Sequence, residues 1–312
     1  MQRRELLKGL ALTGAGGMAL GSLQAAIAAN TSAGGIETEA AMAELMALIN
    51  TKDQDFQNPA WHLYTPDQLA EARVMLLASV DHALDVWRTN DPARPWFMRF
   101  NLPGKKLLGD NPDAIYYETM ISADNSYRIK GNTAGATYVS FTVELERNKD
   151  TLGKLGATIN DSEFDIDENG NYEITVSAKQ QPRNWLRLDK NAKSIAVRNY
   201  FELKEPVCND QLKHVPISIE PINNPGPAPA PNDKDIAKGI RRATDWIDKN
   251  VQPPNPEKSP HWVSKQPNQF TDPKIDDSNQ NVAYAAKDNT YLMAPWLLKP
   301  DEALIITGRF PK

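Results

Sequence analysis

The stretch TYVSFTVEL, residues 137–145, alternates polar and apolar side chains along its whole length. Ser140, Thr142 and Glu144 stand on one side of the pattern, and Val139, Phe141 and Val143 stand on the other. An extended chain turns successive side chains to opposite faces of a sheet, so this period of two predicts a β-strand with one buried face.

Similar patterns flank this strand on both sides and predict that it lies in a sheet. Asn169-Gly170 separates two of the candidates, 164–166 and 172–176, and predicts a hairpin in which both turn residues take a positive φ. Short strands joined by turns are typical of an antiparallel sandwich or jelly roll, which we expect over residues 101–215. The further candidate strands are 115–121, 127–129 and 195–203.

Helical patterns bracket the strands and predict an α+β fold. Residues 29–100 form a helical segment, in which Thr65, Pro66 and Gln68 predict a capped helix start. A Pro-rich linker or loop over 216–232 precedes a helix that begins at Asp233. We expect residues 233–312 to combine this helix with a loop and a final strand, Ala303–Thr307, that completes the β-domain.

Composition and charge exclude several classes of protein. The chain has 312 residues, 40% of them hydrophobic, with one cysteine and a formal charge of -5. A wholly disordered chain and a disulfide scaffold are excluded by these values. The acid excess argues against a nucleic-acid binder, which needs a basic face for the phosphates.

Residues 1–28 have the three parts of an export signal: a basic start, an apolar middle and a small-x-small cleavage site. Arg3-Arg4 followed by Leu-Leu-Lys is similar to the twin-arginine consensus, and the apolar run is diluted by glycine. We therefore expect the twin-arginine export machinery as a partner, a periplasmic location and no stable membrane insertion after cleavage. The single Cys208 cannot form an internal disulfide, which suits folding in the cytoplasm before transport.

The sequence predicts no metal and no cofactor. The four histidines lie at no metal-ligand spacing, and His82 falls on the polar side of its helix, where we expect solvent. Asp165 to Gly170 imitates the start of a calcium loop, but the closing position falls on Val176 instead of an acid. Cys208 beside His214 is compatible with a nucleophile, although a small buried residue explains it more simply.

One set of aromatic and arginine side chains on predicted strands could bind a ligand. Aromatic faces stack on sugar rings, and arginine grips carboxylates with a planar fork. We therefore expect an envelope protein that binds a small or carbohydrate-like ligand; the same side chains could instead be core. Two alternatives stay open. One is a hydrolase or lyase that uses carboxylate or Tyr/Arg chemistry, with Asp110, Asp113 and Asp124 as candidate acids. The other is an assembly role through the final strand. The set is Tyr116, Tyr117, Tyr127, Arg128, Trp185, Arg198 and Tyr200.

Several segments together resemble a bacterial family. They are GDNPDAIYY at 109–117, SAD at 122–124, YRI at 127–129, NWL at 184–186, VRNYF at 197–201 and LKPDEAL at 298–304. Their order resembles the exported proteins built around the domain of unknown function twelve-fourteen. The resemblance implies a jelly-roll-like β-domain with helical additions in the cell envelope, and it brings no established reaction. Such relatives often continue beyond a stretch like 308–312, which raises the expectation of a shortened form or a piece of a longer product.

Overall fold

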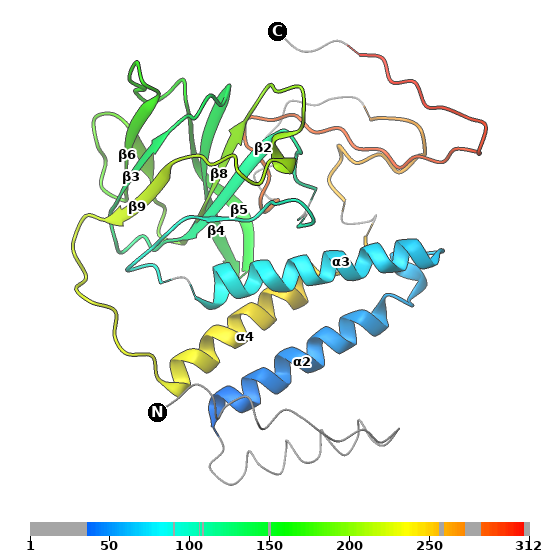
Figure 1. Ribbon diagram of the computed structural model, residues 1–312, viewed down its shortest axis with the longest axis horizontal. Helices are drawn as coiled ribbons and strands as arrows, with labels where there is room; N and C mark the ends of the chain where they lie inside the picture. The colour runs from blue at the N-terminus through cyan, green and yellow to red at the C-terminus, as the bar shows by residue number, and fades with distance from the viewer. Residues whose placement is uncertain are drawn as a thin grey trace.

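Two β-sheets pack face to face and a layer of helices covers one of them. The computed structural model describes residues 36–89, 91–105, 107, 109–148, 151–255, 259–271 and 282–308. In this part of the chain the larger sheet has the order β1-β2-β8-β4-β5 and the smaller one β7-β6-β3-β9 (Figure 1). All neighbouring strands are antiparallel except β6 and β7, which are parallel. The strands are β1 Met98–Arg99, β2 Ala114–Met120, β3 Tyr127–Asn132, β4 Tyr138–Asn148, β5 Thr151–Asn160, β6 Asn171–Ser177, β7 Trp185–Arg187, β8 Ala192–Tyr200 and β9 Ile217–Pro221.

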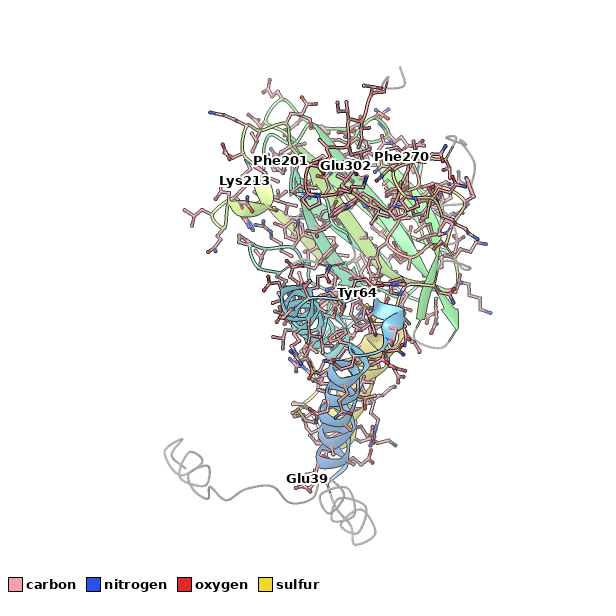
Figure 2. All side chains as sticks on the ribbon, turned by 90° about the vertical axis from the view of Figure 1, so that its right-hand side faces the viewer. Glu39, Tyr64, Phe201, Lys213, Phe270 and Glu302 are labelled. Atoms are coloured by element: carbon pink, nitrogen blue, oxygen red, sulfur yellow. The ribbon has the colours of Figure 1, made fainter. Side chains whose placement is uncertain are left out.

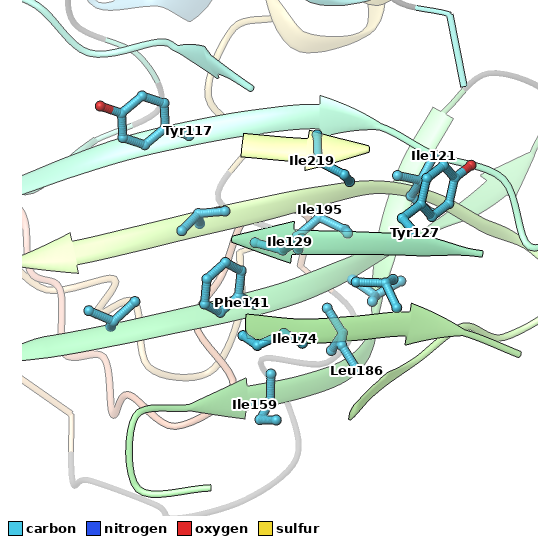
Figure 3. Close-up of a cluster of buried hydrophobic side chains, with 14 of the residues drawn as sticks. Tyr117, Ile121, Tyr127, Ile129, Phe141, Ile159, Ile174, Leu186, Ile195 and Ile219 are labelled. Atoms are coloured by element: carbon cyan, nitrogen blue, oxygen red, sulfur yellow. The ribbon is translucent and has the colours of Figure 1, made fainter. Parts of the chain in front are cut away.

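The interior of the sandwich follows the period of two in the sequence. Val139, Phe141 and Val143 of β4 are fully buried between the sheets, as their alternation predicts. Ile129 and Ile174 from the smaller sheet meet them from the other side (Figure 3). Burial of these apolar side chains is the main term that holds the two sheets together.

The helices lie on the outer face of the larger sheet, with α4 between α3 and α2 (Figure 1). They are α2 Glu37–Asp55, α3 Pro66–His82 and α4 Asp233–Asn250, and a π-helical turn, Ala83–Arg88, continues α3. The predicted capping box is present: Thr65 Oγ1 accepts from Gln68 N at 3.2 Å, and Gln68 Oε1 accepts from Thr65 N at 3.1 Å. Figure 2 shows the helices narrowing to a tip near Glu39, away from the sheets.

The start of α2 is capped by the start of α4. The Asp233 carboxylate accepts from the backbone N–H groups of Glu37 at 2.7 Å and Thr38 at 3.0 Å. Ile36, in the N-cap position of α2, offers no side-chain bond of its own. The hydroxyl of Thr38 adds a further bond, and these contacts hold the pKa of Asp233 below its usual value.

The α+β class, with a sandwich core, N-terminal helices and a C-terminal helix, is confirmed, and three local expectations are wrong. Residues 303–307 form no strand in the described range 282–308, because Ile305 and Ile306 stay 83% and 64% exposed with no sheet edge beside them. The segment 216–232 is not all linker, since β9 pairs with β3. The hairpin at Asn169-Gly170 is absent: only Gly170 takes a positive φ, and β6 pairs with β3 and β7.

The predicted signal peptide, residues 1–28, lies outside the described residues. In the part of the chain that is described, no helix is both long enough and apolar enough to cross a membrane.

Candidate functional site

The outer face of the larger sheet carries polar side chains in register across three strands. Tyr116 on β2, Arg198 on β8 and Ser140 on β4 form one row, because Arg198 pairs with both of the others. Two rows further along, Ser194 pairs with Glu144. Adjacent strands place paired residues close together on one face, so these groups form one polar surface. Both faces of β2 are buried, since Ala114, Tyr116 and Met120 on its outer face pack with the helices.

A cavity of about 750 Å³ lies over this surface. Its floor includes Tyr116, Arg198 and Tyr200 from the sheet, and its other walls come from the loops before β2 and near the C-terminus. Its volume falls in the range of about 300–1,000 Å³ that is typical of small-molecule sites. The other lining residues are Phe100, Leu107, Gly109, Asp110, Asn111, Pro112, Asn250, Trp262, Val282, Ala283, Tyr284, Ala285, Asn289, Tyr291 and Met293.

Residues 282–293, here called the strap, are tied to the sheet by Arg198. Its Nη2 donates to the carbonyl oxygens of Tyr284 at 2.7 Å and Ala285 at 3.0 Å, and its Nη1 donates to Thr142 Oγ1 at 3.1 Å. Arg198 is only 3% exposed, so these bonds replace its contacts with water. Within the strap, Ala286 N donates to Tyr291 Oη at 2.8 Å. Arg198 therefore positions one wall of the cavity.

Two buried carboxylates hold the strap from below. Glu118 and Glu144 are both fully buried. The Tyr284 hydroxyl donates to both Glu118 oxygens at 3.2 Å, and the Tyr284 N–H donates to Glu144 Oε1 at 3.2 Å. His82 Nε2 lies 3.3 Å from Glu118 Oε2. Neither carboxylate lines the cavity, whereas Tyr284, which contacts both of them, does.

Burial dominates the electrostatics of these groups. It raises the pKa of Glu144 to about 8, against the opposing effect of the Arg198 charge and the N–H of Tyr284, while Glu118 adds to the rise. It also raises the pKa of Tyr284 well above its usual value, and the charges of Glu118 and Glu144 act in the same direction. Burial therefore favours the protonated form of Glu144 at pH 7 and keeps Tyr284 a hydrogen-bond donor.

Aromatic side chains supply the flat surfaces of the cavity. Trp262 and Tyr291 stand with ring centroids 5.3 Å apart and their planes 33° from parallel. Tyr116 and Tyr200 meet edge to face at 6.4 Å. Tyr116 Oη accepts from Asn111 N at 3.0 Å, which orients its ring, and burial raises the pKa of this phenol.

The structure brings together three of the seven side chains that the sequence proposes for binding: Tyr116, Arg198 and Tyr200. Tyr117 and Tyr127 lie inside the sandwich. Tyr127 Oη donates to the carbonyl of Pro92 at 2.9 Å, and Tyr117 Oη donates to that of Val215 at 3.3 Å. They are core residues that satisfy their hydroxyls on the backbone.

The remaining two proposed binding residues lie on the smaller sheet, away from the cavity. Arg128 is paired at the surface with Glu173, with 3.0 Å between Nε and Oε1. Trp185 is half-buried on the edge strand β7 and donates from Nε1 to the carbonyl of Ser177 at 3.0 Å. Neither lines the cavity described above.

The expectation that His82 is solvated is wrong. The side chain is fully buried, with the Trp246 ring 4.8 Å and the Phe100 ring 5.6 Å away. It lies at the last residue of α3, where the π-helical turn begins and the 3.6-residue period no longer decides which side faces the core. The sequence could not predict that His82 lies next to the buried Glu118, because this proximity depends on how α3 packs on the sheet.

Of the three candidate acids, Asp110 lines the cavity, whereas Asp113 and Asp124 do not, and neither do the candidate calcium ligands at 165–170. Asp165 is ion-paired with Arg183, and Asp167 accepts from the N–H groups of Asn169 and Asn171, which explains the Asp-rich turn. Among the described residues, no group of three or more His, Cys, Asp or Glu could hold a metal ion. Cys208 is buried, with Sγ 3.5 Å from Asn209 Oδ1.

Comparisons with known proteins identify the fold and no function. No family model matches the chain, and no curated protein matches it. The chain is similar to an uncharacterized protein from Burkholderia cenocepacia of known crystal structure, with a TM-score of 0.60 and 20% identity over 68% of this chain. It spans 57% of the length of that protein. A protein from Vibrio parahaemolyticus shares 16% identity over 50% of this chain and 46% of its own, with a TM-score of 0.25, which is too low to show a shared fold.

Proposed function

We propose that this protein binds a small, carbohydrate-like ligand in the cavity between the larger sheet and the strap. The observation that carries the proposal is the character of the lining. Trp262, Tyr291 and Tyr200 offer aromatic faces, and amide side chains such as Asn111 and Asn250 stand beside them. Among the described lining residues only Asp110 and Arg198 carry a charge, and Arg198 is bonded to the strap. Aromatic faces with neutral hydrogen-bonding groups suit a polyhydroxylated ring.

Binding accounts for the site better than the catalytic alternative. A hydrolase or lyase needs an acid or base within hydrogen-bond reach of the substrate. Asp110 is the only acid among the described lining residues, so no pair of acids faces the ligand. Glu118 and Glu144 are fully buried and contact Tyr284. Their contacts are with the strap, so they support the wall of a binding site.

We further propose that the ligand is met in the periplasm. The support is the twin-arginine-like signal of residues 1–28 and the absence of any need for a disulfide, since Cys208 is the single cysteine. The family resemblance supports the same location.

A sugar panel tests the binding proposal. The full chain is screened by thermal shift against monosaccharides and disaccharides, and hits are titrated by calorimetry. Trp262→Ala removes one aromatic wall and should weaken binding about tenfold, from a stacking contribution of about 1.5 kcal/mol. Trp296→Ala is the matched control, because Trp296 is 73% exposed and does not line the cavity. The proposal fails if no sugar binds, or if both variants bind as the parent protein does.

A further inference from the structure

A second cavity of about 280 Å³ lies beside the main one. It is lined by Tyr138, Asn160, Tyr200, Asp288 and Asn289. The two cavities share Tyr200 and Asn289, so these two side chains form the partition between them. Asn289 Nδ2 lies 3.4 Å from Tyr200 Oη, which is long for a hydrogen bond and easily exchanged for a contact with a ligand.

The second cavity contains a hydroxyl without a partner. Tyr138 Oη is buried and makes no hydrogen bond with any described residue. Its ring is fixed by an edge-to-face contact with Tyr200, with centroids 5.8 Å apart. Native proteins rarely leave a buried hydroxyl unpaired, and such groups often await a ligand or water.

The second cavity also contains an acid without a cation. Asp288 forms no ion pair within the described part of the chain, and burial raises the pKa of its carboxyl. The protein carries a net charge of -5, which attracts cations to such a site over a longer range. Asp288 nevertheless stays exposed enough for a ligand to reach it, and a carboxylate without a positive partner is best matched by an ammonium group.

We propose that the second cavity is a subsite for the far end of the same ligand, where Asp288 binds an ammonium group and the Tyr138 hydroxyl bonds a neighbouring ring hydroxyl. This inference rests on the proposed function. It defines the ligand class as an amino sugar long enough to pass between Tyr200 and Asn289. The main cavity holds one ring, and the second cavity holds the ring whose ammonium group binds Asp288.

Three matched disaccharides test the subsite by calorimetry at pH 6. The probes are the β1,4-linked glucosamine disaccharide, its N-acetylated form and cellobiose, which share a skeleton and differ in charge. We expect the glucosamine disaccharide to bind at least about tenfold more tightly than the other two, as a charge-assisted hydrogen bond implies. Asp288→Asn should abolish this preference while leaving the affinity for cellobiose unchanged.

Further variants separate the possible outcomes. Tyr138→Phe should weaken binding of all three disaccharides but not of single-ring glucosamine, and it should leave the thermal midpoint unchanged because the hydroxyl has no partner to lose. Asp301→Asn, an exposed acid on the C-terminal segment, is the charge control and should keep the preference. Equal affinities for the three probes, or a preference that persists in Asp288→Asn, overturn the subsite alone. Failure of every sugar to bind overturns the proposed function and the subsite together.

Discussion

Replacing Glu144 by glutamine tests whether a neutral acid supports the strap. The substitution keeps the shape of the side chain and an oxygen for the N–H of Tyr284, which now lies 3.2 Å from Oε1. It removes only the ability to ionise. The consequence for stability depends on pH, because the pKa of the folded carboxyl is raised from 4.5 to about 8.

The sign of the change in stability with pH depends on whether the folded or the unfolded chain holds the Glu144 proton more tightly. Below pH 4.5 the carboxyl is protonated in both states and burial imposes no pH-dependent cost. Between pH 4.5 and about 8 the unfolded chain ionises while the folded protein keeps its proton, so the wild-type protein loses stability as the pH rises. Each pH unit in this window removes about 1.4 kcal/mol, which amounts to on the order of 3 kcal/mol at pH 7. Glu144→Gln does not pay this cost.

Urea unfolding at half-unit steps from pH 4.5 to pH 8.5 measures the difference. We expect the wild-type protein and Glu144→Gln to have similar free energies of unfolding at pH 4.5. As the pH rises towards 8, the free energy of unfolding of the variant should increasingly exceed that of the wild type. Glu168→Gln, in an exposed turn, is the control and should follow the wild-type curve. Parallel curves for wild type and Glu144→Gln would show that this carboxyl is already ionised in the folded protein and refute the reasoning.

Three further changes test other features. Replacing both Arg3 and Arg4 by lysine should leave the uncleaved protein in the cytoplasm, which fractionation and mass measurement would detect; normal processing would contradict the twin-arginine proposal. Thr65→Ala removes the cap of α3 and should cost about 1 kcal/mol in urea unfolding, whereas Thr65→Ser, which keeps the hydroxyl, should cost much less. Gly131→Ala places a methyl group against the phenol of Tyr172 and should destabilise the sandwich by about 1–3 kcal/mol, and an unchanged midpoint would mean that this ring moves freely.

The sandwich was predictable because its interior obeys one simple rule. Val139, Phe141 and Val143 alternate with polar residues, and burial of one set follows from the geometry of an extended chain. The rule fails for Ser140, Thr142 and Glu144, which alternation places in solvent and which are fully buried instead, with Thr142 bonded to Arg198 and Glu144 to the strap. A polar face looks the same in sequence whether water or another part of the chain covers it.

The candidate site was predictable only in part for the same reason. On the paired strands β2 and β8, Tyr116 lies opposite Arg198, and Tyr200 lies two residues further along the same face, so strand pairing brings the three side chains together. Tyr284 and Tyr291 come from a segment in which apolar residues do not repeat at helix or strand spacing. No local sequence pattern therefore connects them to Glu118 or Glu144. Adjacent tyrosines also mislead: Tyr116 and Tyr117 are both buried, on opposite faces, because this sheet has no wet face there.

The bond between Asp233 and the first turn of α2 has a consequence for the order of synthesis. The amides of Glu37 and Thr38 leave the ribosome early, and the carboxylate that receives them follows 196 residues later. A nascent chain that stops before Asp233 leaves the beginning of α2 without these two bonds. Protection of those two amides from hydrogen exchange would thus report that translation has reached α4.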